Sequence, residues 1–144
     1  MYIRNATYKD APAIRTLLNA LGYNTTISLL IGQLEKIPGQ KDHQVFVYEL
    51  DKQVIGFMAV HYLPQLGFNG ELVLITYLAV DAELANQGID KALEEHLTTQ
   101  ALQRKCDRIQ VHCSDWRVPA HRFYEEQGYR EYPKYYSKRL IYAE

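Results

Sequence analysis

The feature that most constrains the fold is residues 71–80, ELVLITYLAV, which are almost wholly apolar. A strand of this kind is typical of the centre of a sheet that is covered on both faces. A polar turn and a helical pattern follow it directly, in residues 81–106. This run therefore predicts a buried central strand that leads straight into a helix.

Shorter patterns predict the other strands. Apolar and polar residues alternate at residues 2–6, and two strand-like stretches flank the polar pair Asp51-Lys52, which is typical of a hairpin. The complete set of expected strands is 2–6, 44–50, 53–63, 71–80, 107–113 and a closing pair at 129–133 and 134–142. The chain is thus expected to contain about seven strands.

Four helices are expected, at residues 7–23, 25–39, 81–105 and 118–128. Asp10 is the expected N-cap of the first, Pro12 falls in its first turn, and Gly22 ends it. Pro38-Gly39 ends the second helix and Gly128 ends the fourth. The order of strands and helices predicts an α+β sheet with helices on both faces.

Composition narrows the class of protein. The chain has 144 residues, 47% hydrophobic and 23% charged, with a formal net charge of -1. One globular domain spanning residues 1–144 is expected, and a broadly basic nucleic-acid binder is disfavoured. Two cysteines exclude a disulfide framework, and no apolar run approaches the roughly 18 residues of a membrane helix. With no signal-peptide pattern at the N-terminus, a cytoplasmic protein without membrane or nucleic-acid partners is expected.

Two places could carry chemistry. The turn after residue 80 opens a helix, and the free backbone N–H groups of a helix start favour an anion such as a phosphate; an ordinary strand–helix turn is the alternative. The short helix 118–128 carries Tyr124, which could face a cleft and donate a proton or could simply pack in the core. Cys106, His112, Cys113 and His121 match no ordinary zinc spacing, so no metal is expected.

Five motifs in order resemble the GNAT superfamily of N-acetyltransferases over essentially the whole chain. They are the opening "IRNAT" to "LGY" segment, "VIGFMAVH", "ITYLAVDAELANQGIDKAL", "SDWRVPAHRFY" and "AHRFYEEQGY". The resemblance is to a branch of small-amine acetylators that includes aminoalkylphosphonate and aminoglycoside acetyltransferase-like proteins. It implies a mixed, mostly antiparallel sheet flanked by about four helices and splayed between its fourth and fifth strands. Homodimer formation is expected mostly from the same resemblance.

The resemblance also implies a site for acetyl-CoA. Backbone groups of Leu78, Ala79 and Val80 would pair with the pantetheine arm, and Tyr124 would protonate the departing thiolate. Backbone N–H groups of the loop would face the pyrophosphate; the loop residues are Ala85, Asn86, Gln87, Gly88, Ile89 and Asp90. The amine would attack the thioester directly, with the carbonyl oxygen polarised by a backbone N–H near Ala79 and Val80.

The loop departs from the family pattern of Arg/Gln-x-x-Gly-x-Gly/Ala. Ala85 lacks a long polar side chain, Asn86 replaces a usual glycine, and Asp90 replaces a usual glycine or alanine. A carboxylate beside a pyrophosphate is repelled by on the order of 1 kcal/mol or more. Asp90 could instead favour the helix start by its charge. Arg117 stands where many members have Asn, and it could reach a phosphate or be solvated.

The sequence leaves the identity of the general base open. Many members place Glu on the central strand where this chain has Tyr77. The remaining candidates are Glu71, His61, His112 and Asp115, with a water relay or an amine that needs no strong base as alternatives.

Two functions follow. The first is an acetyl-CoA-dependent N-acetyltransferase that acts on a primary amine of a small molecule. The alternative is a catalytically weak or inactive binding or regulatory module on the same fold, for which the altered loop is the main argument.

Overall fold

The structure is a computed structural model that describes residues 2–112, 118–132 and 135–140. It divides into two compact units, residues 1–112 and 113–144. The first unit carries the sheet with α1, α2 and α3, and the second carries α4. The expected single domain of residues 1–144 stays a prediction.

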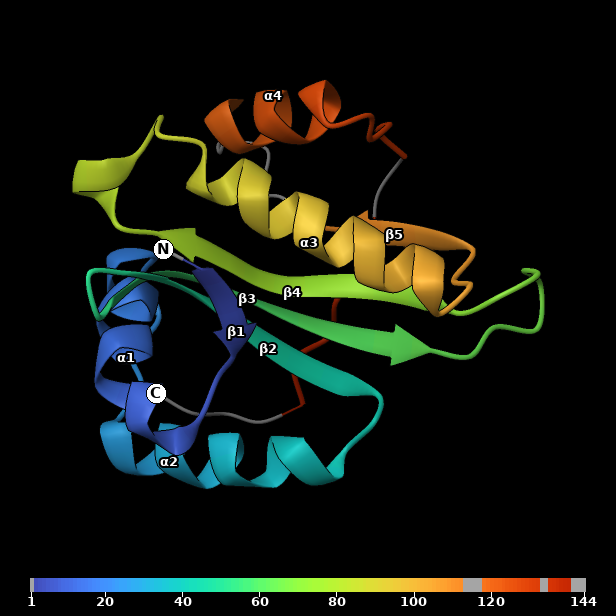
Figure 1. Cartoon of the computed structure of the whole chain (residues 1–144). Helices are drawn as coiled ribbons and strands as arrows, with labels where there is room; N and C mark the ends of the chain where they lie inside the picture. Colours follow the sequence, from blue (N-terminus) through green and yellow to red (C-terminus); the bar gives the residue numbers. More distant parts are fainter. Residues whose placement is uncertain (1, 113–117, 133–134, 141–144) are drawn as a thin grey trace. The chain divides into compact units, whose positions relative to one another are not determined.

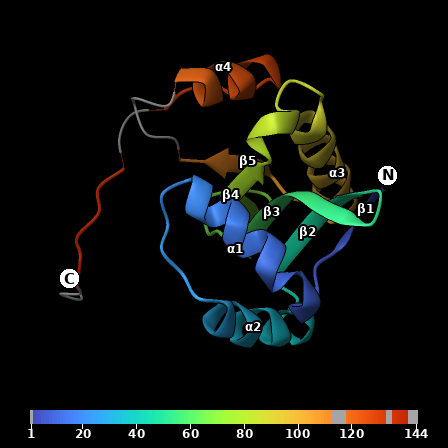
Figure 2. The same cartoon turned by 90° about the vertical axis from the view of Figure 1, so that its left-hand side faces the viewer.

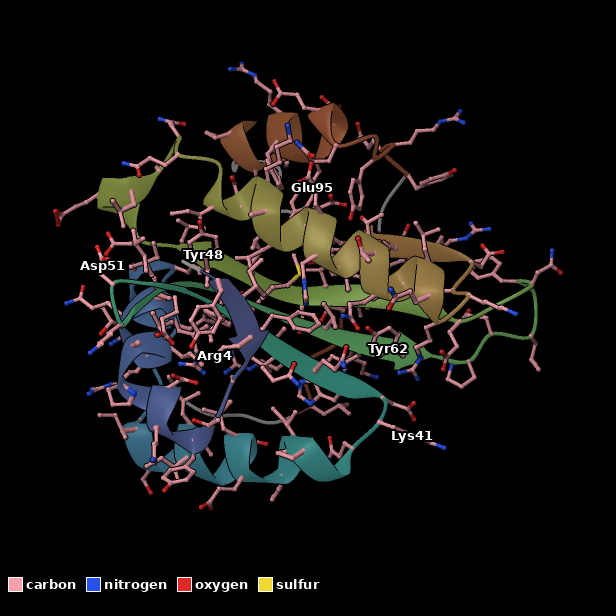
Figure 3. All side chains as sticks on the ribbon, viewed as in Figure 1. Arg4, Lys41, Tyr48, Asp51, Tyr62 and Glu95 are labelled. Carbon is pink, nitrogen blue, oxygen red and sulfur yellow. The ribbon has the colours of Figure 1, made fainter. Side chains whose placement is uncertain are left out.

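The sheet has five strands in the order β1-β2-β3-β4-β5. The first three pairings are antiparallel and the β4–β5 pairing is parallel, so the sheet is mixed and mostly antiparallel, as expected. The strands are β1 (Tyr2–Asn5), β2 (His43–Leu50), β3 (Gln53–Leu63), β4 (Leu72–Val80) and β5 (Arg108–Val111). The β2–β3 turn is a tight hairpin because Asp51 (labelled in Figure 3) and Lys52 both have positive φ, 51° and 65°.

Helices cover both faces of this sheet, as Figures 1 and 2 show. α1 packs on β3 and β4 from one side, with α2 against α1, while α3 contacts β2 to β5 from the other side. The helices are α1 (Ala11–Ala20), α2 (Ile27–Lys36), α3 (Ile89–Gln103) and α4 (Val118–Glu126). Three 3-10 turns accompany them: η1 (Tyr8–Asp10), η2 (Ile37–Gly39) and η3 (Ala82–Leu84).

A bulge on β4 determines which side chains face which helices. Ala59 pairs with Tyr77 and Val60 pairs with Ile75, so Thr76 is left over on β4. Beyond this extra residue, the odd-numbered side chains of β4 point to the opposite face of the sheet from those before it. Ile75, opposite Val60, is buried on the α3 side, whereas Ala79 joins the buried cluster under α1.

The cores on the two faces are distinct. Under α1 the buried cluster is Ala11, Ile14, Leu17, Leu18, Leu34, Val45, Val47, Phe57, Ala59 and Ala79. On the other side α3 buries Ile89, Leu93 and Leu97. A Cβ at Gly56 would meet Ile89 Cγ2 at 3.2 Å and the Ala79 carbonyl oxygen at 3.3 Å, so the glycine lets α3 approach the sheet closely.

Asp10 is the N-cap residue of α1, as expected, but its carboxylate has a different role from that of an ordinary N-cap. Asp10 stands at the N-cap position, but its side chain makes no cap hydrogen bond to α1. Its carboxylate instead accepts from the Thr7 N–H (2.8 Å) and pairs with both terminal nitrogens of Arg4 (2.9 Å each). Asp10 therefore closes the capping box of η1, and the Arg4 guanidinium and Thr7 lower its pKa although burial opposes this. Pro12 lies in the first turn, and Gly22 follows the helix with φ 98°, both as expected.

The expected closing pair of strands is not found. Within the described parts of that segment, residues 129–132 and 135–140, the backbone forms no strand, so five of the expected seven strands are observed. The many tyrosines of this segment have high strand propensity, which alone does not supply a pairing partner. The Tyr129 N–H instead donates to the Tyr124 carbonyl (3.0 Å), which extends the end of α4.

The Arg4–Asp10 pair gives a test of stability. We expect Arg4→Met (Arg4 is labelled in Figure 3) to lower the free energy of unfolding by about 2 kcal/mol, because it leaves the buried Asp10 carboxylate without its cation. Chemical denaturation at pH 7 measures this. Arg15→Met is the matched control, since its guanidinium donates to the Thr25 carbonyl at the surface; we expect a change within about 0.5 kcal/mol. Equal losses in the two variants would contradict a special role for the Arg4–Asp10 pair.

Candidate functional site

The site begins where β4 loses its partner on one side. The parallel ladder with β5 runs from Leu72–Arg108 to Ile75–Val111. β3 continues beside β4 as far as Gly56–Val80. In the described residues, β4 from Thr76 to Val80 therefore has a strand on its β3 side and none on its β5 side.

The direction of the β4 backbone groups follows from the ladder. The Asp81 N–H donates to the Ile55 carbonyl on β3 (2.8 Å). Because N–H groups alternate between the two sides of a strand, the Ala79 amide also points to β3, and those of Leu78 and Val80 point away from it. These two amides face the unpaired edge, where an extended ligand could add to the sheet. The residues from which the resemblance implied pantetheine pairing thus lie on this edge.

The loop after β4 keeps a helix-start geometry. Asp81 accepts the Glu83 N–H (2.9 Å) and caps η3, and α3 begins after Gly88. Asn86 has φ 70° and Gly88 has φ 80°, so both adopt the left-handed conformation. Asn is among the residues that tolerate this region, so Asn86 preserves a backbone that usually requires glycine. A Cβ at Gly88 would meet no atom within 4 Å, which leaves open space in front of the helix start.

Asp90 occupies part of that helix start. Its carboxylate Oδ1 accepts the Lys91 N–H in the first turn of α3 at 2.8 Å. Gly88 contributes no side-chain cap, so Asp90 places the negative charge that the helix dipole favours. The same charge lies where an anion would bind. One geometry therefore fits both interpretations of Asp90, a favourable charge at the helix start and a charge that repels a pyrophosphate.

The α1 side of the sheet beside this edge is aromatic. Tyr77 packs edge-on against Tyr23 (ring centroids 5.3 Å apart) and stacks near Phe57 (6.4 Å). Tyr23 and Tyr77 are 46% and 36% exposed, so their rings remain accessible in part. Burial, followed by the proximity of Tyr23, raises the pKa of Tyr77, which makes it a poor base.

Two histidines continue this face. His43 and His61 are cross-strand partners whose rings stack with centroids 4.0 Å apart. His43 is two residues from Val45 on β2, and His61 is two residues from Ala59 on β3. Side chains two apart on a strand share a face, so both histidines lie on the α1 side. Burial lowers the pKa of both imidazoles, and the neighbouring His61 lowers that of His43 further.

The other candidate bases do not lie together with the two histidines. Arg104 holds Glu71 through both carboxylate oxygens, at 2.7 and 3.2 Å, and also pairs with Asp42. Glu71 therefore serves a structural ion pair at the far end of β4. His112 follows β5 and is exposed. Asp115, together with Arg117, lies outside the described residues.

Tyr124 lies on α4 in the second unit. Its ring packs edge-on against Phe123 (5.1 Å) and Tyr129 (5.3 Å), both in the same unit. Its expected role as a proton donor stays a prediction.

The sequence analysis did not predict three features of the site. The Thr76 bulge is hidden because the strand is apolar on both faces, so no alternation reveals a change of face. The two-residue turn at Asp51-Lys52 alone would pair His43 with Val60; an irregularity between Tyr48 and Glu49 shifts the register by one residue and brings His43 opposite His61. The contact of Tyr23 with Tyr77 depends on tertiary packing.

Across the described ranges, the longest apolar helix falls short of what a bilayer span needs. Among the same residues, no three His, Cys, Asp or Glu side chains gather into a group that could hold a metal ion.

Comparison with known proteins gives one family and many similar structures. The acetyltransferase (GNAT) family model matches residues 14–129. No curated protein matches the chain.

Three solved structures illustrate the similarity of fold. A transcriptional regulator from Bacillus halodurans C-125 aligns with TM-score 0.88 at 20% identity, covering 96% of this chain and 99% of that one. Glucosamine-6-phosphate N-acetyltransferase from Arabidopsis thaliana gives 0.85 at 22%, covering 97% and 98%. An aminoglycoside acetyltransferase from an uncultured soil metagenomic sample, in complex with trehalose, gives 0.79 at 21%, covering 97% and 96%.

Proposed function

Because the chain belongs to the GNAT acetyltransferase family, we propose that it is an acetyl-CoA-dependent N-acetyltransferase acting on a primary amine of a small molecule. The observation that carries the proposal is the end of the β4–β5 ladder at Ile75–Val111 within the described residues, with a helix-start loop at the end of β4. This arrangement offers backbone donors along an open edge and an anion site beyond it.

Residues on this edge fit the cosubstrate. The amides of Leu78 and Val80 would bond the pantetheine arm, and Ala79 holds the strand to β3. The loop from Ala85 to Asp90 would hold the pyrophosphate through backbone N–H groups, with the left-handed Asn86 and Gly88 shaping the turn. When bound, acetyl-CoA supplies an activated acetyl thioester. An amide on the open edge would polarise its carbonyl oxygen.

The acceptor would lie on the α1 side. Tyr23 and Tyr77 offer accessible ring surface there. Between Ala59 and His61 on β3, and from Leu74 to Tyr77 on β4, the described side chains on this face include no carboxylate. A polycationic acceptor would find no compensating charge on these strands, whereas a monoamine with an apolar or aromatic body fits them.

Tyr124 would protonate the departing thiolate. Its place on α4 matches the family motif "AHRFYEEQGY". A phenol that donates as the C–S bond breaks needs no charge of its own, and a general acid of this type contributes about 10²–10⁴-fold. Formation of a homodimer and a cytoplasmic location remain predictions.

The alternative is a binding or regulatory module with weakened cosubstrate binding. One observation favours it: Asp90 already occupies the Lys91 N–H at the helix start. Calorimetric titration with acetyl-CoA and with CoA separates the two functions. We expect micromolar dissociation constants. The absence of binding near millimolar concentrations would refute the transferase proposal and favour the module.

Charge at the loop gives a sharper test. Asp90→Asn retains the shape and an acceptor for the Lys91 N–H but removes the charge, so we expect CoA to bind about 5-fold more tightly, equivalent to about 1 kcal/mol. Titration at low salt measures this. S-acetylpantetheine lacks the pyrophosphate, and its affinity should be unchanged.

Glu95→Gln is the matched control for net charge. Glu95 lies exposed on α3 (labelled in Figure 3), away from the first turn. Tightening of the same size in both variants would mean that only long-range charge matters. Equal gains for CoA and S-acetylpantetheine would show that Asp90 does not face the pyrophosphate.

Tyr124→Phe tests the proton donor. We expect kcat to fall about 100-fold with an unchanged KM for acetyl-CoA, because the variant loses the acid and keeps the ring. Steady-state kinetics with a primary-amine acceptor measure this. Tyr132→Phe, at a residue 69% exposed, is the control and should retain activity. Full activity in Tyr124→Phe would assign the proton to another group.

A further inference from the structure

The proposed chemistry needs a proton acceptor, and the His43–His61 stack is the strongest candidate in the described residues. The two rings are nearly parallel, with an interplanar angle of 16° and centroids 4.0 Å apart. Their backbones pair directly across β2 and β3. This stack fixes His61 against a second ring, so its orientation is set before any ligand binds.

His61 is the member closer to the open edge. β3 lies between β2 and β4, and His61 pairs with Leu74 on β4. The Ala59–Tyr77 row lies two residues along β3, roughly 7 Å away at the usual rise per residue. His61 and Tyr77 share the α1 side, so an amine lying on Tyr77 would be within reach of His61 directly or through one water.

Competing bases on the described strands are occupied or unsuited. Both oxygens of Glu71 bind Arg104. Tyr77 stands on β4 as a protonated phenol whose pKa burial has raised. His61 lies on the same face as Tyr77, on the strand next to β4, and burial lowers the pKa of its imidazole.

We infer that His61 accepts the proton of the acceptor amine, and that His43 positions its ring. The inference rests on the proposed transferase function. It adds to that function the group that activates the nucleophile and a requirement for an acceptor that arrives as an ammonium ion.

The protons and electrons balance as follows. The ammonium gives one proton to an imidazole nitrogen of His61, and the lone pair released on nitrogen forms a bond to the thioester carbonyl carbon. The C–S bond breaks, and its electron pair stays on sulfur, which takes a proton from Tyr124. The second proton of the nitrogen and the proton on His61 leave to solvent, and solvent returns one proton to Tyr124, so one proton is released in each turnover.

The pKa directions agree with this role. Burial lowers the pKa of His61, so the imidazole is unprotonated at pH 7. Burial lowers the pKa of His43, and repulsion from His61 lowers it further, so a proton on one ring disfavours a proton on the other. Ionisable groups on the adjoining elements are Lys41 and Asp42 before β2, Tyr77 on β4 and His112 after β5; Asp42 is paired with Arg104 at 3.0 Å.

Proton NMR titration of the imidazole resonances tests the pair without acetyl-CoA. In the unmodified protein we expect His61 to titrate below the ordinary value of about 6.5. In His61→Phe the ring stack is retained, and the pKa of His43 should rise because the repulsion disappears. A titration of His61 well above pH 7 would overturn the inference, because a largely charged imidazole cannot accept the proton at neutral pH.

Kinetics test the step itself. With 2-phenylethylamine, an ammonium ion at pH 7, we expect His61→Phe to lower kcat/KM about 100-fold and to remove the acidic limb of its pH profile. With hydroxylamine, which is largely unprotonated at pH 7, the loss should be less than about 5-fold. The acetyl-CoA dissociation constant should not change.

His96→Phe is the matched control. His96 is also half-buried, and burial also lowers its pKa, but it packs edge-on against Phe46 from α3 on the opposite face. We expect its pH profile to match that of the unmodified protein. Suppose that the unmodified protein is active. Equal losses of kcat/KM in His61→Phe and His96→Phe, or equal losses for the two acceptors in His61→Phe, would then refute the role of His61 but not the transferase proposal. An unmodified protein that binds no acetyl-CoA would refute the transferase proposal, and the titration would then bear only on the ring pair.

Discussion

Strand β4 changes its surroundings part-way along its length, and the site follows from that change. Up to Ile75 it is hydrogen-bonded on both sides; beyond Thr76, in the described residues, it pairs with β3 alone. An unpaired strand edge presents free backbone N–H and C=O groups, so an extended ligand arm could add to the sheet there. The Thr76 bulge lies at this point, and the Thr76 hydroxyl donates to the Ala59 carbonyl (3.1 Å), which pins the irregularity.

The bulge also decides what the ligand would meet. Without the extra residue, Ile75, Tyr77 and Ala79 would share one face. With it, Ile75 supports α3, whereas Tyr77 turns to the α1 side and meets Tyr23. A single inserted residue therefore gives β4 a conventional buried segment and a segment whose edge and aromatic face are both available.

The sequence was sufficient for elements whose signals are local. Asp51-Lys52 determined the hairpin, Gly22 and Gly128 ended their helices, and the apolar run at residues 71–80 became β4. Signals that depend on tertiary partners were less informative. Asp10 has the residue type of an N-cap, yet Arg4 on β1 and Thr7 bind its carboxylate. The tyrosine-rich segment has strand propensity, but its described residues form no ladder.

In the loop from Ala85 to Asp90, the shape of the backbone and the charge are set by different residues. Sequence comparison with the family motif counted Asn86 and Asp90 alike as departures, yet Asn86 retains the left-handed backbone, and Asp90 alone changes the electrostatics. The magnitude of that change decides how the two functions compare. A carboxylate near a helix start interacts with the dipole by about 0.3–1 kcal/mol, and its repulsion of a nearby phosphate is of order 1 kcal/mol. The dipole interaction is present with and without ligand, so the repulsion alone weakens binding, by about fivefold at 1.4 kcal/mol per decade, against about 8 kcal/mol for a micromolar ligand. Asp90 would therefore reduce the affinity of the proposed site for a pyrophosphate without abolishing it, and for this reason we propose the transferase rather than the inactive module.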